Sequence, residues 1–378
     1  MAPATQTRPS GKTPPAGGLT GAPLRHLLRP PDQAVGRIFY HNLWFRGHSN
    51  PRYSALLPRF ERLDPYVVTC SDNRWARAVQ YRAHRASREA RHRAVFALAA
   101  RHYVFTFSTD HEQVRHVRGP VVVDVDDPLF TEAEAESLRR PNVRAFVVTA
   151  EWAAERYRQM GVRAPHHVVP QGVAAASVTA DARARVAALK RPGEVVVGYQ
   201  SAWLLAAGDH DGANPLYNVD HLLDLWDRVR ERAPQARLWL VGQASERVRR
   251  RGAGRDDVVL FGRLPQGEAL AHVANFDIGL YPRTADHGVP QAVKVTEMVG
   301  LGVPVVAYDY QVTSLVRESG AGVLVGGPDE FVGALAHLVG DAGARADYAA
   351  AAAAFAPSLE WDTLAARYQR DVLDAYLA

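Results

Sequence analysis

The sequence predicts an α/β protein with two domains, in each of which parallel strands alternate with helices. Short valine-rich runs, typical of strands buried on both faces, recur along the chain between longer amphipathic stretches. The length of 378 residues favours two domains, and an apolar content of 47% is enough for two packed cores. Residues 174–193 are rich in alanine, arginine and aspartate and end in a Pro-Gly pair, so we expect a linker helix there.

These observations predict four segments. Residues 1–34 are rich in proline, glycine, threonine and alanine without periodicity, which predicts a disordered tail. A first domain is expected over residues 35–190 and a second over 191–356. The amphipathic residues 357–378 are expected to form a closing helix.

The most informative stretch is residues 280–326. An apolar strand ending at Tyr281 leads into a polar loop, and Pro290 is expected to open a helix, where a missing N–H costs least. The helix is expected to stop at Gly302, and Pro304–Tyr308 reads as a buried strand. Strand, loop, helix and strand form half of a doubly wound nucleotide-binding domain.

Lys294 and Glu297 lie three residues apart on one face of this predicted helix. The free N–H groups and positive dipole end of a helix start bind anions, and a lysine adds a full charge. A lysine for phosphate and a carboxylate for ribose hydroxyls would together grip a nucleotide sugar. The chain has only three lysines, Lys12, Lys190 and Lys294, among 45 basic residues. The alternative is an ordinary ion pair on a surface helix.

The run VKVTEMVGLGVPVVAYD, followed by GAGVLV from Gly320, resembles the donor-site signature of GT-B glycosyltransferases. The closest likeness is to family 4 and to chitobiosyldiphosphodolichol β-mannosyltransferase, and it spans roughly Val195 to the C-terminus. The resemblance implies two Rossmann-like domains facing across a cleft, with the C-terminal helix crossing back to the first. It implies a hexosyl transfer from a UDP-, GDP- or dTDP-linked sugar to an acceptor hydroxyl, with no cofactor and no metal.

The sequence departs from family 4 at two places. Family 4 usually has a second glutamate eight residues before the one matched by Glu297, but this chain has Val289 there and Asp286 out of register. This leaves the sugar open, and also whether the enzyme retains or inverts the anomeric configuration. The loop after Tyr199 lacks the arginine and Lys-Gly pair that commonly hold the diphosphate. Lys294 and Arg283 are therefore the expected phosphate ligands.

The resemblance implies further donor-binding residues. Backbone groups of the turn from Gly262 to Pro265, which includes Leu264, would contact the base. Pro290 would begin the anion-binding helix. Gly47, in the loop after the first strand, would let the backbone approach the donor.

A second group of candidates follows the strand in VVVDVDDPLF, residues 121–130. Acidic residues at the carboxyl end of a buried strand lie where open α/β sheets bind ligands. Asp126 or Asp127 would act as general base toward the acceptor hydroxyl. Two alternatives stay open: Asp124 and Asp126 as a metal-binding D-x-D, and Asp127 or Thr131 as a helix cap. His111 is an alternative base.

Charge divides the chain. The net charge of +5 combines +12 over residues 1–190 with −7 over residues 191–378. The arginine-rich segment Arg74–Arg93 could dock an anionic lipid surface or a phosphate-bearing acceptor. It could also be a solvated helix face. No nucleic-acid-binding motif accompanies the charge, so nucleic acid is not an expected partner.

One cysteine, Cys70, excludes an internal disulfide framework and fits a reducing cytoplasm. No apolar run reaches the ~20 residues of a membrane span, and the N-terminus lacks an apolar signal segment. We expect a cytoplasmic enzyme, and a peripheral location at the inner membrane face stays open. The acceptor would be a saccharide, a lipid-linked molecule or a natural product. Two other functions stay open: a nucleotide-sugar epimerase, or a partner subunit that binds nucleotide without turnover.

Overall fold

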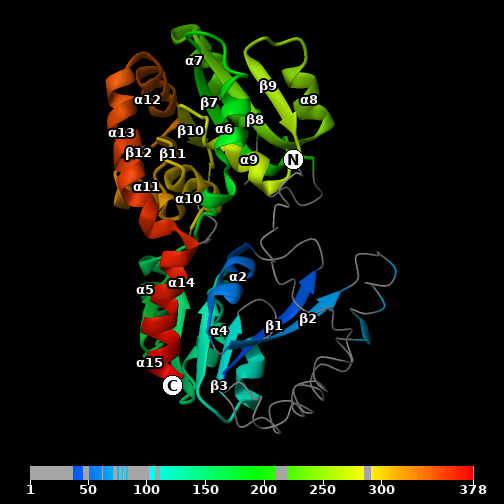
Figure 1. Cartoon of the computed structure of the whole chain (residues 1–378), viewed down its shortest axis with the longest axis vertical. Helices are drawn as coiled ribbons and strands as arrows, with labels where there is room; N and C mark the ends of the chain where they lie inside the picture. Colours follow the sequence, from blue (N-terminus) through cyan, green and yellow to red (C-terminus); the bar gives the residue numbers. More distant parts are fainter. Residues whose placement is uncertain are drawn as a thin grey trace, which may run out of the picture. The chain divides into compact units, whose positions relative to one another are not determined.

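The computed structural model describes residues 37–45, 51–61, 63–70, 75, 79, 82–83, 102–106, 111–209, 219–284 and 291–377. The chain divides into two compact units (Figure 1). The first holds the described residues up to Val169 together with those from Ala365 onward, and the second runs from Pro170 to Leu364. Within the described ranges, every helix is too short or too polar to cross a bilayer.

The first unit is built on a six-stranded parallel sheet with the strand order β2-β1-β3-β4-β5-β6. Its strands are β1 (Arg37–Phe45), β2 (Leu63–Cys70), β3 (His102–Thr106), β4 (Val121–Val125), β5 (Val143–Val148) and β6 (His166–Val168). Its main helices are α2 (Pro51–Leu56), α4 (Glu132–Leu138) and α5 (Glu151–Gln159). The strand order reverses between β1 and β3, next to β4, and ligands of open α/β sheets bind at such a reversal.

The C-terminal residues pack with this first unit. Helix α14 (Trp361–Tyr368) continues through a π-helical turn (Gln369–Leu373) into α15 (Asp374–Tyr376). The Phe60 and Tyr368 rings lie 5.0 Å apart, and the side chain of Gln369 accepts the N–H of Glu61 at 3.1 Å. These contacts hold the end of the chain against residues far away in sequence.

The second unit has a six-stranded parallel sheet in the order β12-β11-β10-β7-β8-β9, the order of a Rossmann fold (Figure 1). Its strands are β7 (Val195–Leu204), β8 (Ala236–Ala244), β9 (Val258–Gly262), β10 (Ile278–Tyr281), β11 (Val305–Tyr308) and β12 (Gly322–Val325). Its helices are α6 (Ala180–Ala187), α7 (Val219–Arg232), α8 (Glu246–Gly252), α9 (Gln266–Val273), α10 (Val293–Gly300), α11 (Ser314–Ser319), α12 (Pro328–Gly340) and α13 (Ala342–Phe355).

Alternation along β7 sends side chains into two cores, one on each face of this sheet. Val195, Val197 and Tyr199 join the cluster that includes α7 and α12. Val196 joins the cluster that includes α6, α9 and α10. Period-2 alternation therefore places Gln200 on the α10 face of the sheet.

Helix α6, within the expected linker, belongs to the second unit. Its Ala182 and Val186 are buried in that unit's core, and Asn275 donates to the carbonyl of Arg183 at 3.1 Å. The first boundary therefore falls at Val169, before α6, and not at residue 190. Packing of its apolar face decides where a short amphipathic helix belongs.

Candidate functional site

Strands β7 and β10 are neighbours in the second sheet, although β8 and β9 come between them in sequence. The strand order reverses here, which makes the carboxyl ends of β7 and β10 the expected ligand site. Gln200 lies toward the carboxyl end of β7. The loop after β10 carries Arg283, and α10 carries Lys294 and Glu297. The fold thus brings together residues that are nearly 100 positions apart.

Helix α10 begins at Val293, later than expected. Ala292 is its N-cap residue and provides no side-chain hydrogen bond to the helix start. Pro290, expected as the first helical residue, lies outside the described residues, as does Gly47. The helix ends as expected: Gly302 has φ +79°, and the N–H of Val303 donates to the carbonyl of Met298 at 2.9 Å. This is the Schellman pattern, which favours glycine.

Lys294 and Glu297 have pKa values near neutral. Both side chains keep some solvent contact, but protein surrounds most of each charged group. This burial lowers the pKa of Lys294 to about 8; Glu297 opposes the shift and Arg283 adds to it. Burial likewise raises the pKa of Glu297 to about 7, against the opposing effects of Lys294 and of a hydrogen bond from Gln200.

Arg283 adds a second positive charge. The residue is only 9% exposed, and its guanidinium carbon lies 5.9 Å from the centre of the Tyr281 ring. Its Nε is buried without a hydrogen-bond partner among the described residues. Buried donors are normally satisfied, so this N–H is expected to have an acceptor beyond the described residues.

The backbone next to Arg283 is held in place. The hydroxyl of Tyr310 donates to the carbonyl of Thr284 at 3.0 Å. Tyr308, at the end of β11, hydrogen-bonds to His221 of α7 at 2.8 Å. The first contact joins the loop after β10 to the residues that follow β11, and the second joins β11 to α7. Packing against these elements therefore supports the position of Arg283.

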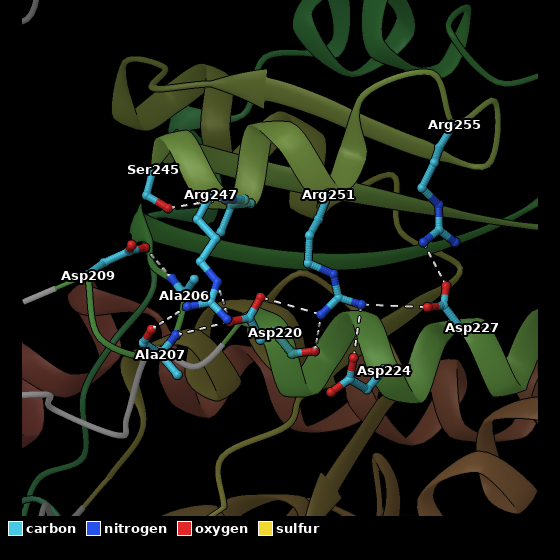
Figure 2. A network of polar contacts seen from close by, with 11 residues as sticks. Ala206, Ala207, Asp209, Asp220, Asp224, Asp227, Ser245, Arg247, Arg251 and Arg255 are labelled. Carbon is cyan, nitrogen blue, oxygen red and sulfur yellow. Dashed lines mark hydrogen bonds and ion pairs between the residues drawn. The ribbon is translucent and has the colours of Figure 1, made fainter.

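A charged network anchors the loop that leaves β7. Three aspartates of α7 meet two arginines of α8 and one that follows it: Asp220, Asp224, Asp227, Arg247, Arg251 and Arg255 (Figure 2). Asp220 Oδ2 accepts the N–H of Ala207 at 3.2 Å, and Arg247 donates to the Ala207 carbonyl at 3.1 Å. Arg247 and Asp220 also pair at 3.3 Å. The backbone N–H and the backbone carbonyl of Ala207 are thereby both held, three residues after the end of β7.

In the first unit, Asp124 is the centre of a buried cluster. Arg52 of α2 is completely buried, and its Nε and Nη2 each lie 3.2 Å from one oxygen of Asp124. Arg52 also donates to the carbonyl of Val169 at 2.9 Å. Tyr53 donates to Asp124 at 3.3 Å, and Tyr368 of α14 hydrogen-bonds to the same carboxylate.

This cluster argues against the D-x-D alternative, because the guanidinium of Arg52 already pairs with both oxygens of Asp124. Burial alone would lower the pKa of Arg52, but the charges of Asp124 and then Asp126 raise it. Asp126, 6% exposed, therefore lies in the field of the same guanidinium. Among the described residues, no three histidine, cysteine or acidic side chains are grouped so as to hold a metal ion.

Asp127 differs from Asp126 in its exposure. It is exposed at the surface, although desolvation by nearby protein raises its pKa. It does not cap the next helix, because Thr131 is the N-cap of α4 and forms a capping box with Glu134. Of the two aspartates, Asp127 is therefore the one open to an acceptor. His111 begins a 3-10 turn, and only its backbone is described.

Comparisons with known proteins bear on both units. Residues 202–341 match the family model described as glycosyl transferases group 1. HepE of Anabaena, solved with UDP, has a TM-score of 0.66 and 17% identity, covering 89% of this chain and 100% of its own. Sucrose-phosphate synthase from Thermosynechococcus elongatus has a TM-score of 0.62 and 14% identity, and the match covers 90% of this chain and 99% of that protein. WaaG, a glycosyltransferase involved in lipopolysaccharide biosynthesis, has a TM-score of 0.58 and 12% identity, and the match covers 89% of this chain and 99% of that protein. A search of curated proteins by sequence found no match.

The chain has the GT-B glycosyltransferase fold. Its matched region, residues 202–341, is a glycosyltransferase domain, and it contains Arg283, Lys294 and Glu297. The predictions of this fold and of a glycosyltransferase that uses a nucleotide sugar are confirmed. The resemblance to the mannosyltransferase stays a prediction.

The glycosyltransferase fold brings some predicted donor residues together and not others. Arg283, Lys294 and Glu297 form one cluster at the carboxyl ends of β10 and β7. Gly262, with φ +72°, ends β9, two strands away from β7. Leu264 is partly buried and packs against the core on the sheet face that α6, α9 and α10 cover. A role for Gly262 and Leu264 in base contact stays a prediction.

Gln200 is the site residue that sequence reasoning missed. Its side-chain amide donates to a carboxylate oxygen of Glu297. The available signal was a polar residue directly after the buried run Val195–Tyr199, in the second half of its strand. On the first unit, Arg52 was missed in the same way, because nothing near it in sequence indicates its pairing with Asp124.

Proposed function

We propose that this glycosyltransferase moves a hexosyl group from a nucleoside diphosphate sugar to an acceptor hydroxyl, with the donor bound by the second unit. One observation carries the proposal: Lys294 lies near both Arg283 and Glu297, so that among the described residues two positive charges meet one carboxylate, and Arg283 Nε has no acceptor among those residues. A diphosphate supplies the missing negative charge and hydrogen-bond acceptors. HepE was solved with UDP, which supports a uridine nucleotide as the first to test.

In this proposal, each residue of the second unit acts at a stated part of the donor. Lys294, Arg283 and the first N–H groups of α10 stabilise the diphosphate as it leaves with the electrons of the broken glycosidic bond. This is the charge stabilisation that a metal supplies in other enzymes, so the reaction is proposed to be metal-independent. Glu297 accepts hydrogen bonds from ribose hydroxyls.

The first unit is proposed to bind the acceptor. Asp127 takes the proton of the acceptor hydroxyl as its oxygen bonds to the anomeric carbon. Desolvation raises the pKa of Asp127, which makes it a stronger base than an ordinary aspartate. Asp126 is close to Arg52. We propose that its charge pairs with that guanidinium and that it does not contact the acceptor proton.

The cellular setting is also a proposal: the cytoplasm, with contact to an anionic membrane through the arginine-rich segment of the first unit. Trp75 and Val79, four positions apart, are 82% and 68% exposed, and Arg82 is exposed nearby. An aromatic and a basic residue together suit a lipid interface. Equal sedimentation with neutral and anionic vesicles would contradict this proposal.

Incubation with UDP-, GDP- and dTDP-linked hexoses tests the function. We expect calorimetric binding of one nucleoside diphosphate, and either slow hydrolysis or transfer of its sugar. Interconversion of sugars would show an epimerase instead, and binding without any change would show a silent partner subunit. Absence of binding at millimolar nucleotide would overturn the proposal.

Asp127→Asn is expected to reduce turnover by about 100-fold or more, because general base catalysis contributes about 10²–10⁴-fold. Nucleotide affinity should stay unchanged, since Asp127 lies in the other unit. Asp126→Asn is the matched comparison, with a smaller expected effect on turnover. A larger loss in Asp126→Asn, at equal thermal stability, would assign the base to Asp126.

A further inference from the structure

We propose that Gln200 positions the carboxylate of Glu297 to receive both ribose hydroxyls, so that the site prefers ribonucleoside diphosphates over their 2′-deoxy counterparts. This inference rests on the proposed function, because it takes Glu297 to face the ribose. It goes further in naming a positioning residue and a donor class. Of the three nucleotides considered, it favours UDP and GDP over dTDP.

The place of Gln200 in the fold supports a positioning role. Val195–Tyr199 are buried, whereas Gln200 is only half-buried; it lies in the second half of β7, which continues to Leu204. The pairing of β7 with β8 shifts register immediately afterwards, between Gln200 and Trp203. A bulge beside a ligand site commonly directs a side chain. Here that side chain points to the face of the sheet that α10 covers.

The hydrogen bond from Gln200 restricts the orientation of the Glu297 carboxylate. Gln200 Nε2 donates to Oε2 of Glu297, so the two residues are joined across the point where the strand order reverses. A carboxylate has two oxygens and about four acceptor positions. With Oε2 held from the β7 side, the plane of the group is set, and the ribose hydroxyls would be received by Oε1 and the remaining position on Oε2. Two neighbouring hydroxyls require two such acceptors at once.

Glu297 needs this restraint because a cation, Lys294, lies beside it. Lys294 lies one helical turn earlier on α10, and Arg283 lies close enough to Lys294 to affect its charge. Without Gln200, attraction would draw the carboxylate toward Lys294 and away from the ribose. The amide on the opposite side balances that pull. A neutral donor does so without adding a third positive charge.

The test is the ratio of affinities for UDP and 2′-deoxy-UDP, measured by calorimetry on the full chain, with GDP and 2′-deoxy-GDP if the protein prefers guanine. We expect the natural protein to bind the ribonucleotide about tenfold or more tightly, the size of one lost hydrogen bond to a charged group. Gln200→Met keeps the side-chain volume but removes the donor. It should reduce the ratio to within about twofold while leaving affinity for the deoxynucleotide almost unchanged.

Two further variants separate the possible failures. Glu297→Ala should also abolish the preference; if it does not, Glu297 does not bind ribose and that part of the proposed function fails. If Glu297→Ala abolishes the preference but Gln200→Met retains it, the positioning role is overturned. Equal weakening of both nucleotides in Gln200→Met would mean a purely structural residue and would also overturn it.

Gln243→Met is the matched control. Gln243 lies near the end of the neighbouring strand β8, and in the part of the chain that the structure describes its amide donates to the carbonyl of Ala244, at 3.5 Å. The same substitution there should leave the ratio unchanged. A changed ratio in this control would overturn the specific assignment to Gln200.

Discussion

Replacement of Lys294 by alanine is expected to lower the affinity for UDP by about 10- to 100-fold, corresponding to about 1.5–3 kcal/mol for a charge-assisted contact. The variant removes one of the two positive charges that we propose bind the diphosphate, and leaves Arg283 as the other. Calorimetric titration measures the change. Lys190→Ala is the control, because Lys190 forms an ion pair with Asp277 at 3.0 Å and should not affect binding. Unchanged affinity in Lys294→Ala would exclude Lys294 from the site.

The lowered pKa of Lys294 predicts how the affinity for UDP depends on pH. Because the pKa of Lys294 is lowered to about 8, its ammonium is charged below that pH and lost above it. The affinity of the natural protein for UDP should therefore fall as pH rises from about 8, by up to tenfold per pH unit. Below about 7, protonation of Glu297 should weaken ribose binding, so affinity is greatest between these two values.

Lys294→Arg distinguishes this explanation from a general loss of structure. A guanidinium stays protonated throughout this range, so the decline above pH 8 should disappear while binding below it persists. A decline that is identical in both proteins would show that another group titrates.

Replacement of Arg52 by alanine is expected to lower the free energy of unfolding of the first unit by about 3–5 kcal/mol, the usual cost of removing one partner of a buried ion pair. The substitution leaves the carboxylate of Asp124, 1% exposed, with only tyrosine donors. It also removes the donor to the Val169 carbonyl. Hydrogen exchange resolved along the chain measures the effect, with lost protection in β4 and β5 and retained protection in β8.

Two comparisons show whether charge is the cause. Arg52→Met combined with Asp124→Leu removes both charges and should recover much of the lost stability. Arg370→Ala removes a surface pair with Asp371 and should leave exchange unchanged. If Arg52→Ala is as mild as Arg370→Ala, the buried pair does not hold these elements together.

Local sequence signals located the donor helix but not its surroundings. Lys294 and Glu297 were recognisable because a helix places residues three apart on one face. Its end at Gly302 was recognisable because glycine favours the positive φ that ends many helices, and Gly302 has positive φ in the structure. Its start was wrongly placed at Pro290, since a proline favours the first turn of a helix without determining it; the helix begins at Val293.

Contacts between residues far apart in sequence were not predicted, because sequence spacing carries no information about them. Gln200 and Glu297 meet only because β7 and β10 pair in the sheet. Asp124 was weighed as a metal ligand from its D-x-D spacing, but Arg52, 72 positions earlier, pairs with it. Likewise, the apolar face of α6 assigned a presumed linker helix to the second unit.

The sequence by itself determined the α/β class, the nucleotide-binding stretch and the charged residues available for a diphosphate. Periodicity, turn chemistry and short motifs act within a few residues, so they can be read directly from the chain. Only the tertiary structure decided which charges neutralise one another, which aspartate stays open to solvent and which amide restrains Glu297. Those properties depend on burial and on distances between strands, which arise only when the sheets assemble.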